Sequence, residues 1–320
     1  MTAPLRRLLC ALALLAASAP TSGCDKNRAE SIKLVNEGIR AVNAGSPEAA
    51  YGYFVRATRI DPENHRAYYE AALVDLYDKG RHDEGLGRLE TAEKLAPHDR
   101  DVLFQIGRTH VVDGQREQGL RYLERAIAED PNYGSAWYYK GVALSGLGRY
   151  AEADLAFREA IAINPHDVTA FRELGLLYEQ FDAFDASKGV YDEGLRLNPD
   201  DPDLLNNLGA LAIEQGQVKD AIALFERAKA RGQGRQDLVF NLAFAYVADN
   251  NIREAYRNLG EYINSADPTA AEQIRIANMI RSAMLERLQE EKDKREEERE
   301  RAEQGQAAPP GGATDPTPQP

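Results

Sequence analysis

Histidine is the side chain that most readily moves protons or binds metals near neutral pH, so the histidines are the first candidates for chemistry. They are His65, His82, His98, His110 and His166. No two have the close spacing of a zinc site, and the sequence has no His-Glu-x-x-His pattern. The glycines recur with a structural period and form no loop that could cradle a phosphate. We therefore predict no catalytic residue, no metal site and no cofactor, and hence a protein that is not an enzyme; His110 is expected to be packed in the core.

The charge balance disfavours two classes of partner. The chain has 320 residues, 52 of them Asp or Glu and 39 Lys or Arg, and its formal net charge is −13. Proteins bind nucleic acid and anionic lipid surfaces largely through Lys and Arg, so an acidic surface repels both. Hydrophobic residues make up 43% of the chain, enough for a substantial core. We expect a protein or peptide partner, no nucleic acid and no small-molecule substrate.

The first residues have the composition of an export signal. Arg6 and Arg7 precede an apolar run at residues 8–17, and small residues follow. The run is roughly half of the 20 residues or so that a helix needs to cross a bilayer. A positive start, a short apolar stretch and a small-residue exit are typical of a secretory signal peptide, which we predict at residues 1–23.

Two cleavage sites compete within this signal. An Ala-x-Ala site ends at Ala19, with Pro20 directly after it. The other site resembles that of bacterial lipoproteins, in which the bond between Gly23 and Cys24 is cut and the Cys24 thiol receives a lipid; Thr21 stands where leucine is usual. A plain secreted protein would instead keep an unpaired thiol in an oxidising compartment. We predict lipidation at Cys24 and a periplasm-facing protein, and leave open whether its membrane is the inner or the outer one.

Most of the remaining sequence repeats with a period of about 34 residues. Prolines that follow Asp, Asn or Ala recur at about this step: Pro62, Pro97, Pro131, Pro165, Pro199 and Pro268. The interval from Pro62 to Pro97 is one residue longer, and the interval from Pro199 to Pro268 spans about two periods. Turn residues keep the same step: Gly45, Gly80, Gly114, Gly148, Asp182, Gly216 and Asn250. Proline cannot continue a helix, and glycine supplies the backbone conformation of a tight turn. The two series therefore mark the ends of paired helices.

Between these boundaries small residues face large ones. One unit reads Trp137, Gly141, Ala153, Phe157, Ala160 and Pro165. Two antiparallel helices can approach closely at Gly141 and Ala153, and Phe157 fills the gap that remains. This pattern resembles the tetratricopeptide repeat (TPR). The resemblance covers residues 31–268 in seven units and implies an all-α fold, a right-handed superhelical solenoid of helix-turn-helix repeats with a concave groove.

The segments that flank the repeats have simpler compositions. Residues 24–30 are predicted to be a linker, residues 269–303 a capping helix that continues as a charged helix, and residues 304–320 a disordered tail. The apolar residues available to cover the last repeat are Ile274, Ile276, Met279, Ile280 and Met284. A coiled coil needs apolar residues along its seam, and the sequence has none at these positions beyond Leu288. Oppositely charged residues four positions apart instead support a solvated single helix. Self-association of this helix and the oligomeric state stay open.

In TPR proteins the first helix of each pair lines the groove. We use phase for the position of a residue within its repeat. The resemblance implies that eight residues at groove phases lie there, and we predict that they contact a partner: Arg108, Tyr138, Arg172, Asn206, Asn207, Phe240, Asn241 and Phe244. Asn207 and Asn241 have the same phase in successive units, similar to the asparagine ladder of some TPR grooves, whose amides hydrogen-bond the backbone of an extended peptide. The alternative is that these amides satisfy local backbone groups. The lysines of chaperone-binding TPR grooves are missing, so chaperone tails are not predicted ligands.

The function predicted from the sequence is a scaffold or adaptor in the bacterial cell envelope. It would bind a partner segment in its groove and be held to a membrane through a lipid on Cys24. One alternative is a pilotin-like assembly factor for a type IV pilus or a secretion-system secretin. Another, of a different class, is an accessory subunit of an enzyme complex that acts on cell wall or polysaccharide.

Overall fold

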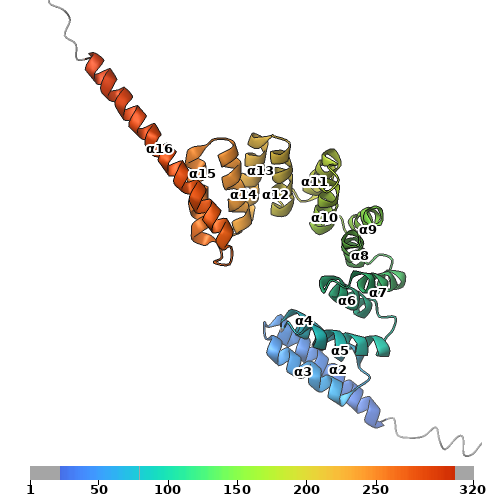
Figure 1. Cartoon of the computed structure of the whole chain (residues 1–320). Helices are drawn as coiled ribbons and strands as arrows, with labels where there is room; N and C mark the ends of the chain where they lie inside the picture. Colours follow the sequence, from blue (N-terminus) through green and yellow to red (C-terminus); the bar gives the residue numbers. More distant parts are fainter. Residues whose placement is uncertain (1–21, 79, 307–320) are drawn as a thin grey trace, which may run out of the picture. The chain divides into compact units, whose positions relative to one another are not determined.

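The computed structural model describes residues 22–78 and 80–306, and every regular element in them is an α-helix (Figure 1). Residues 1–21 of the signal predicted at 1–23 and residues 307–320 of the tail predicted at 304–320 lie outside the described residues. The helices are α2 (Ser22–Asn43), α3 (Pro47–Ile60), α4 (His65–Tyr77), α5 (His82–Leu95), α6 (Arg100–Val112), α7 (Arg116–Glu129), α8 (Gly134–Gly146), α9 (Tyr150–Ile163), α10 (Val168–Glu179), α11 (Phe184–Leu197), α12 (Pro202–Glu214), α13 (Val218–Arg231), α14 (Gln236–Ala248), α15 (Ile252–Ser265) and α16 (Ala271–Gln306).

Fourteen of these helices form consecutive pairs, from α2 with α3 to α14 with α15, and α16 follows the last pair. This arrangement confirms the predicted all-α class, a solenoid built from helix-turn-helix repeats. The chain divides into two compact units, residues 1–173 (unit 1) and residues 174–320 (unit 2). None of the described helices is long and apolar enough to cross a membrane.

A left-handed backbone conformation closes the turn inside each pair. All seven turn residues predicted from the period have a positive φ, between 55° and 80°, including the two that are not glycine, Asp182 and Asn250. In six of these turns the next residue donates its N–H to a carbonyl five residues back, as Arg149 does to Leu144 at 2.9 Å. In the second pair Arg81 reaches six residues back, to Asp75, at 2.7 Å. The extra residue of the second repeat is therefore accommodated in the turn between α4 and α5.

A glycine on the first helix touches a ring on the second in four of the pairs. A Cβ added to Gly38, Gly141, Gly175 or Gly209 would come closer than 3.0 Å to Phe54, Phe157, Tyr191 or Phe225 respectively. All four rings are at most 2% exposed. Because real side-chain carbons do not approach that closely, the spacing of the two helices depends on the missing side chain.

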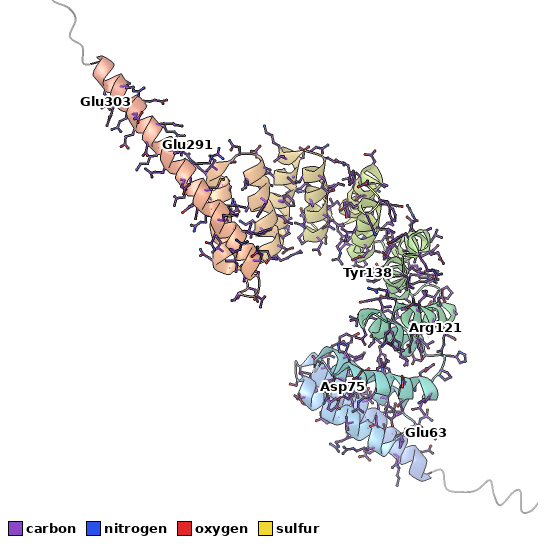
Figure 2. All side chains as sticks on the ribbon, in the orientation of Figure 1. Glu63, Asp75, Arg121, Tyr138, Glu291 and Glu303 are labelled. Atoms are coloured by element: carbon purple, nitrogen blue, oxygen red, sulfur yellow. The ribbon has the colours of Figure 1, made fainter. Side chains whose placement is uncertain are left out.

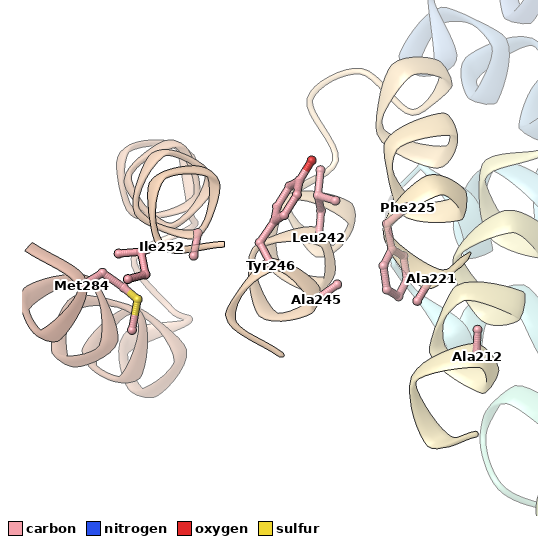
Figure 3. Packing of buried hydrophobic residues seen from close by; sticks show 9 residues of the cluster. Ala212, Ala221, Phe225, Leu242, Ala245, Tyr246, Ile252 and Met284 are labelled. Carbon is pink, nitrogen blue, oxygen red and sulfur yellow. The ribbon is translucent and has the colours of Figure 1, made fainter. Parts of the chain in front are cut away.

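The last helix covers the end of unit 2. Met284 of α16 is buried in a cluster with Ile252 of α15, Tyr246 of α14 and Phe225 of α13 (Figure 3). Ile280 packs against the same cluster, whereas Met279, also expected to cover the last repeat, is 61% exposed. Met279 is on the solvent side of α16 because only one face of a single helix can meet α15.

The structure corrects two predicted boundaries. Residues 24–30, predicted to be a linker, lie within α2; they contain neither Pro nor Gly, so nothing ends the helix there. At the other end, the capping and charged segments form one helix, α16, which continues to Gln306 and thus includes the first residues of the predicted tail. Glu291 and Glu303 mark the charged part of this helix in Figure 2, where nearly every side chain is exposed.

A buried carboxylate ties the irregular second pair to the first. The side chain of Asp75 is fully buried and pairs with two cations, Arg81 and Arg88; Arg88 Nε lies 2.7 Å from Asp75 Oδ2 (Asp75 is labelled in Figure 2). Arg88 also donates to the Tyr51 hydroxyl of α3 at 2.8 Å, and both arginines lie over the Tyr51 ring. This network fixes the lengthened turn against the preceding helix pair.

We expect a methyl group at Gly175 to destabilise unit 2, because it would overlap the buried Tyr191 ring. The Gly175→Ala variant should lose about 1–3 kcal/mol of unfolding free energy, the usual cost of overpacking. Gly189→Ala, in the partner helix α11, is the matched control, because a Cβ there meets no atom within 4 Å. It should be neutral or gain up to about 1 kcal/mol from helix propensity. Chemical denaturation followed by circular dichroism measures both, and equal stability of the two variants would contradict the proposed contact.

Removing the Asp75 carboxylate should leave two arginines without their shared anion. We expect Asp75→Ala to cost about 3–5 kcal/mol, the range for breaking a buried ion pair from one side. Asp78→Ala changes the charge equally at an exposed position one turn away and should change stability by less than about 0.5 kcal/mol. Thermal unfolding of both variants tests this, and a mild effect of Asp75→Ala would show that the network adds little to stability.

Candidate partner-binding face

The first helices of unit 1 carry a contiguous set of aromatic side chains. We call this set, together with one arginine, the aromatic face: Tyr77 of α4, Phe104 and Arg108 of α6, and Tyr133, Tyr138 and Tyr139 at the start of α8 and along it. Phe104 contacts Tyr133 and Tyr139, with ring centroids 4.9 and 5.7 Å apart, and Tyr138 meets Tyr139 edge-on at 5.0 Å. These three tyrosines are half-buried, and Tyr77 is 49% exposed. Each ring is thus held by protein on one side and open on the other.

Hydrogen bonds between neighbouring helix pairs hold this face in place. Tyr77 donates to Gln105 Oε1 at 2.6 Å, which joins α4 to α6. Tyr133 donates to Asp101 Oδ1 at 3.0 Å, which joins the start of α8 to α6. Arg108 Nε donates to the Tyr139 hydroxyl at 2.7 Å. Because each partner belongs to the adjacent repeat, the face is ordered by the same stacking that forms the core.

Tyr138, one of the eight predicted contacts, borders a small cavity. The cavity has a volume of about 210 Å³ and lies between the start of α8, the end of α9 and the start of α10. Burial raises the pKa of Tyr138 from 10.0 to about 12, and the Glu173 carboxylate acts in the same direction. Its hydroxyl is therefore a neutral donor at physiological pH. Arg172, also predicted to contact a partner, already pairs with Glu173 at 2.9 Å.

In unit 2 the predicted asparagines do not all face the same way. Asn241 Nδ2 donates to Asn206 Oδ1 at 2.8 Å, across neighbouring pairs. Asn207 instead lies near the buried Tyr191 hydroxyl, whose pKa is raised by burial and by Glu179 and lowered by Ser187 and Asn207. That hydroxyl makes no hydrogen bond of good geometry with any described residue. The structure thus brings Asn206 and Asn241 together, and places Asn207 near Tyr191 of α11, in the preceding helix pair.

Phe240 and Phe244 are half-buried in the packing at the end of unit 2. Their rings lie 4.5 Å apart, and Phe240 is 4.9 Å from Tyr262 of α15. Both pack against a cluster that includes Ala277 of α16. Much of their apolar surface is therefore buried in the packing of α14 against α15 and α16. Less of it is open to a partner than the sequence analysis predicted from their groove positions.

Three of the five histidines contact a carboxylate of a neighbouring helix pair. His65, His82 and His98 each face a carboxylate of the following pair, at 3.4 Å from Asp99, 2.9 Å from Asp113 and 2.6 Å from Glu129. His110 is buried, as predicted, and stacks on Tyr122 with ring centroids 5.8 Å apart. Across the described residues no group of three or more His, Cys, Asp or Glu side chains is arranged to hold a metal ion.

The sequence analysis missed Tyr77 and Gln105, which complete the aromatic face on the side of α4. The signal was present, because Tyr77 precedes Arg108 by the same number of positions as Arg108 precedes Tyr139. Phase alone placed Arg108 on a first helix, α6; Tyr77, its ring contact in α4, is the last residue before the turn of the second repeat.

Comparison with known proteins identifies the repeats. The family model of the tetratricopeptide repeat matches residues 104–168 and 172–235, so the chain contains tetratricopeptide repeats. A TPR repeat-containing protein from Methanocaldococcus jannaschii is 26% identical over 151 residues, 44% of this chain and 26% of the relative. An uncharacterized protein of the same organism is 42% identical over 53 residues, 17% of this chain and 62% of that protein. The chain therefore spans less than two thirds of either relative.

The fold likeness extends further than the sequence likeness. The crystal structure of a tetratricopeptide repeat protein from Parabacteroides merdae aligns with 78% of this chain and 98% of its own, with a TM-score of 0.62 and 17% identity. Tetratricopeptide repeats stack into arrays with extended concave surfaces that such proteins use for binding.

Proposed function

We propose that this protein is a non-catalytic scaffold that holds an extended segment of a partner protein on the aromatic face of unit 1. One observation carries the proposal: three tyrosines are ordered by their neighbours yet remain half-open. Tyr133 and Tyr139 are held by contacts with Phe104 and by hydrogen bonds, and Tyr138 by its edge-on contact with Tyr139. Rigid aromatic side chains lose little conformational entropy on binding and contribute disproportionately to affinity. The face is therefore preorganised for a guest.

The amide pair in unit 2 is a second place where a peptide backbone could bind. Asn206 and Asn241 use one donor and one acceptor on each other. An amide side chain has two N–H donors and two acceptor lone pairs, so each keeps free capacity for a peptide group. Asn207 stays a predicted contact only through its phase, since its side chain lies toward Tyr191.

We further propose that a lipid on Cys24 anchors the scaffold to a membrane of the bacterial envelope. The support is the signal-like sequence before Cys24 and its resemblance to a lipoprotein junction. Because residues 24–30 belong to α2, the anchored residue would be continuous with the first repeat. The distance between the membrane and the repeats would then be set by a helix.

A change at Tyr138 should weaken partner capture. Affinity capture from detergent-solubilised membranes, with the full chain as bait, should recover partner proteins with wild type and much less with Tyr138→Ala. A loss of tenfold or more in affinity is expected, on the order of 2 kcal/mol for a central aromatic anchor. Leu155→Ala is the matched control, because Leu155 is 64% exposed on α9, the second helix of the same pair.

Equal capture by wild type, Tyr138→Ala and Leu155→Ala would remove the aromatic face from the proposal. Thermal unfolding of the two variants checks that any loss is local. An Asn206→Ala, Asn241→Ala double variant measures the contribution of unit 2 in the same assay.

The captured proteins also distinguish the narrower functions predicted from the sequence. A secretin or pilus component would favour the pilotin-like assembly factor. Enzymes of cell-wall or polysaccharide synthesis would favour the accessory subunit. Other envelope proteins would favour the general adaptor.

Loss of the Cys24 thiol should release the protein from the membrane. Cys24→Ala is expected in the soluble fraction after cell lysis, while wild type sediments with membranes and carries a mass increase equal to its lipid. Cys10→Ala is the control, because it removes the other cysteine and should leave anchoring unchanged. If Cys24→Ala still sediments with membranes, the tether is elsewhere.

A further inference from the structure

Arg108 is held by two aromatic side chains. Its guanidinium carbon lies over both rings, 4.7 Å from the Tyr77 centroid and 5.3 Å from the Tyr139 centroid. Its Nε proton goes to the Tyr139 hydroxyl. The rings fix the plane of the guanidinium, and the two Nη groups keep four of its five N–H donors.

No carboxylate of the described residues lies within ion-pair distance of Arg108. The other cations on the first helices α4, α6 and α8 do have one. Arg66 pairs with Glu70 at 2.7 Å, Arg100 with Asp130, and Lys140 with Glu124 at 3.6 Å. Carboxylates are abundant in a chain with a formal net charge of −13, yet this half-buried arginine of the aromatic face meets only tyrosine rings and a tyrosine hydroxyl.

A cavity opens beside this arginine. Its volume is about 190 Å³, and Arg108 lines it together with Tyr77, Leu76, Val112, Thr109 and His82. An apolar cavity of about 150 Å³ can hold a benzene-sized group. The site thus combines an oriented cation with an apolar recess large enough for one small side chain.

We propose that Arg108 receives the carboxylate of an Asp or Glu side chain in the partner segment, with an apolar neighbour of that residue in the adjacent cavity. This inference rests on the proposed function and names the chemistry of the partner. A planar guanidinium suits a carboxylate because two parallel N–H donors can meet its two oxygens. Rings on both sides, Tyr77 in α4 and Tyr139 in α8, imply a segment that runs past Arg108, so the carboxylate belongs to a side chain and not to a chain end.

Peptide pools of fixed design test this directly. Two pools of short synthetic peptides, acetylated and amidated at their ends, are random except for a central Glu in one and a central Gln in the other. A third pool has the central Gln and a free terminal carboxylate. Each is passed over the immobilised full chain, and the retained peptides are measured by mass spectrometry.

Wild type should retain the Glu pool at least about tenfold better than the Gln pool, as expected for a charge-assisted hydrogen bond. Arg108→Gln should abolish that preference and still retain the Gln pool, which also shows that the variant is folded. Arg108→Lys, which keeps the charge and loses the planar fork, should keep a reduced preference. Arg121→Gln, an equal charge change at an exposed position on α7, should behave as wild type (Figure 2).

The remaining outcomes separate two kinds of failure. Equal retention of the Glu and Gln pools by wild type, or a Glu preference that survives in Arg108→Gln, overturns the assignment of Arg108 and leaves the scaffold intact. Strongest retention of the free-terminus pool overturns the side-chain assignment in favour of a chain end. If wild type retains no pool, the proposed function itself fails, and the inference with it.

Discussion

The close contact between a small residue on one helix and a large side chain on its partner determines the rest of this structure. Where Gly141 meets Phe157, or Gly175 meets Tyr191, the ring occupies the space of the missing side chain and sets the distance between the helices. The third pair solves the same problem with two facing glycines: a Cβ on Gly119 would lie 2.7 Å from the Gly107 carbonyl. Each solution produces a flat, close pair whose remaining apolar surface must be covered by the next pair.

A repeated spacing places equivalent residues of successive repeats side by side, and this produces a binding face from local geometry. The bonds that order the aromatic face join residues nearly one period apart, as in Tyr77 with Gln105 and Tyr133 with Asp101. Each such bond contributes only about 1 kcal/mol to stability. Together these bonds fix the orientation of the aromatic side chains. Side chains that are already held by the neighbouring repeat lose little conformational entropy when a partner binds.

Periodicity made most of the fold predictable and only part of the site. The turn residues, including Asp182 and Asn250, could be read from the step of the sequence because a tight helical turn needs one left-handed residue. Phase also placed Arg108 and Tyr138 on the first helices. Phase could not choose partners: Asn207 lies near Tyr191 on the second helix of the preceding pair, whereas Asn241, at the same phase, donates to Asn206 on the first helix of the preceding pair.

The features that the sequence analysis missed arise where the period is broken. The extra residue in the second repeat lengthens one turn, and Asp75 with its two arginines fills the resulting space. At the end of unit 2, Phe240 and Phe244 pack against a cluster that includes α16, which does not follow the repeat pattern.

The net negative charge of the chain and the positive charge of Arg108 act over different distances. Arg108 is the arginine of the aromatic face, and it has no acidic partner among the described residues. At physiological ionic strength charges separated by more than about 8 Å are largely screened, so the net charge of −13 hardly reaches a guest held against the rings. Contact with Arg108 occurs at hydrogen-bond distance, where screening is weak and the half-buried surroundings strengthen the attraction. A segment that places one carboxylate at Arg108 between apolar contacts would thus be attracted there in spite of the acidic chain. This attraction needs no complementary charge elsewhere on the scaffold.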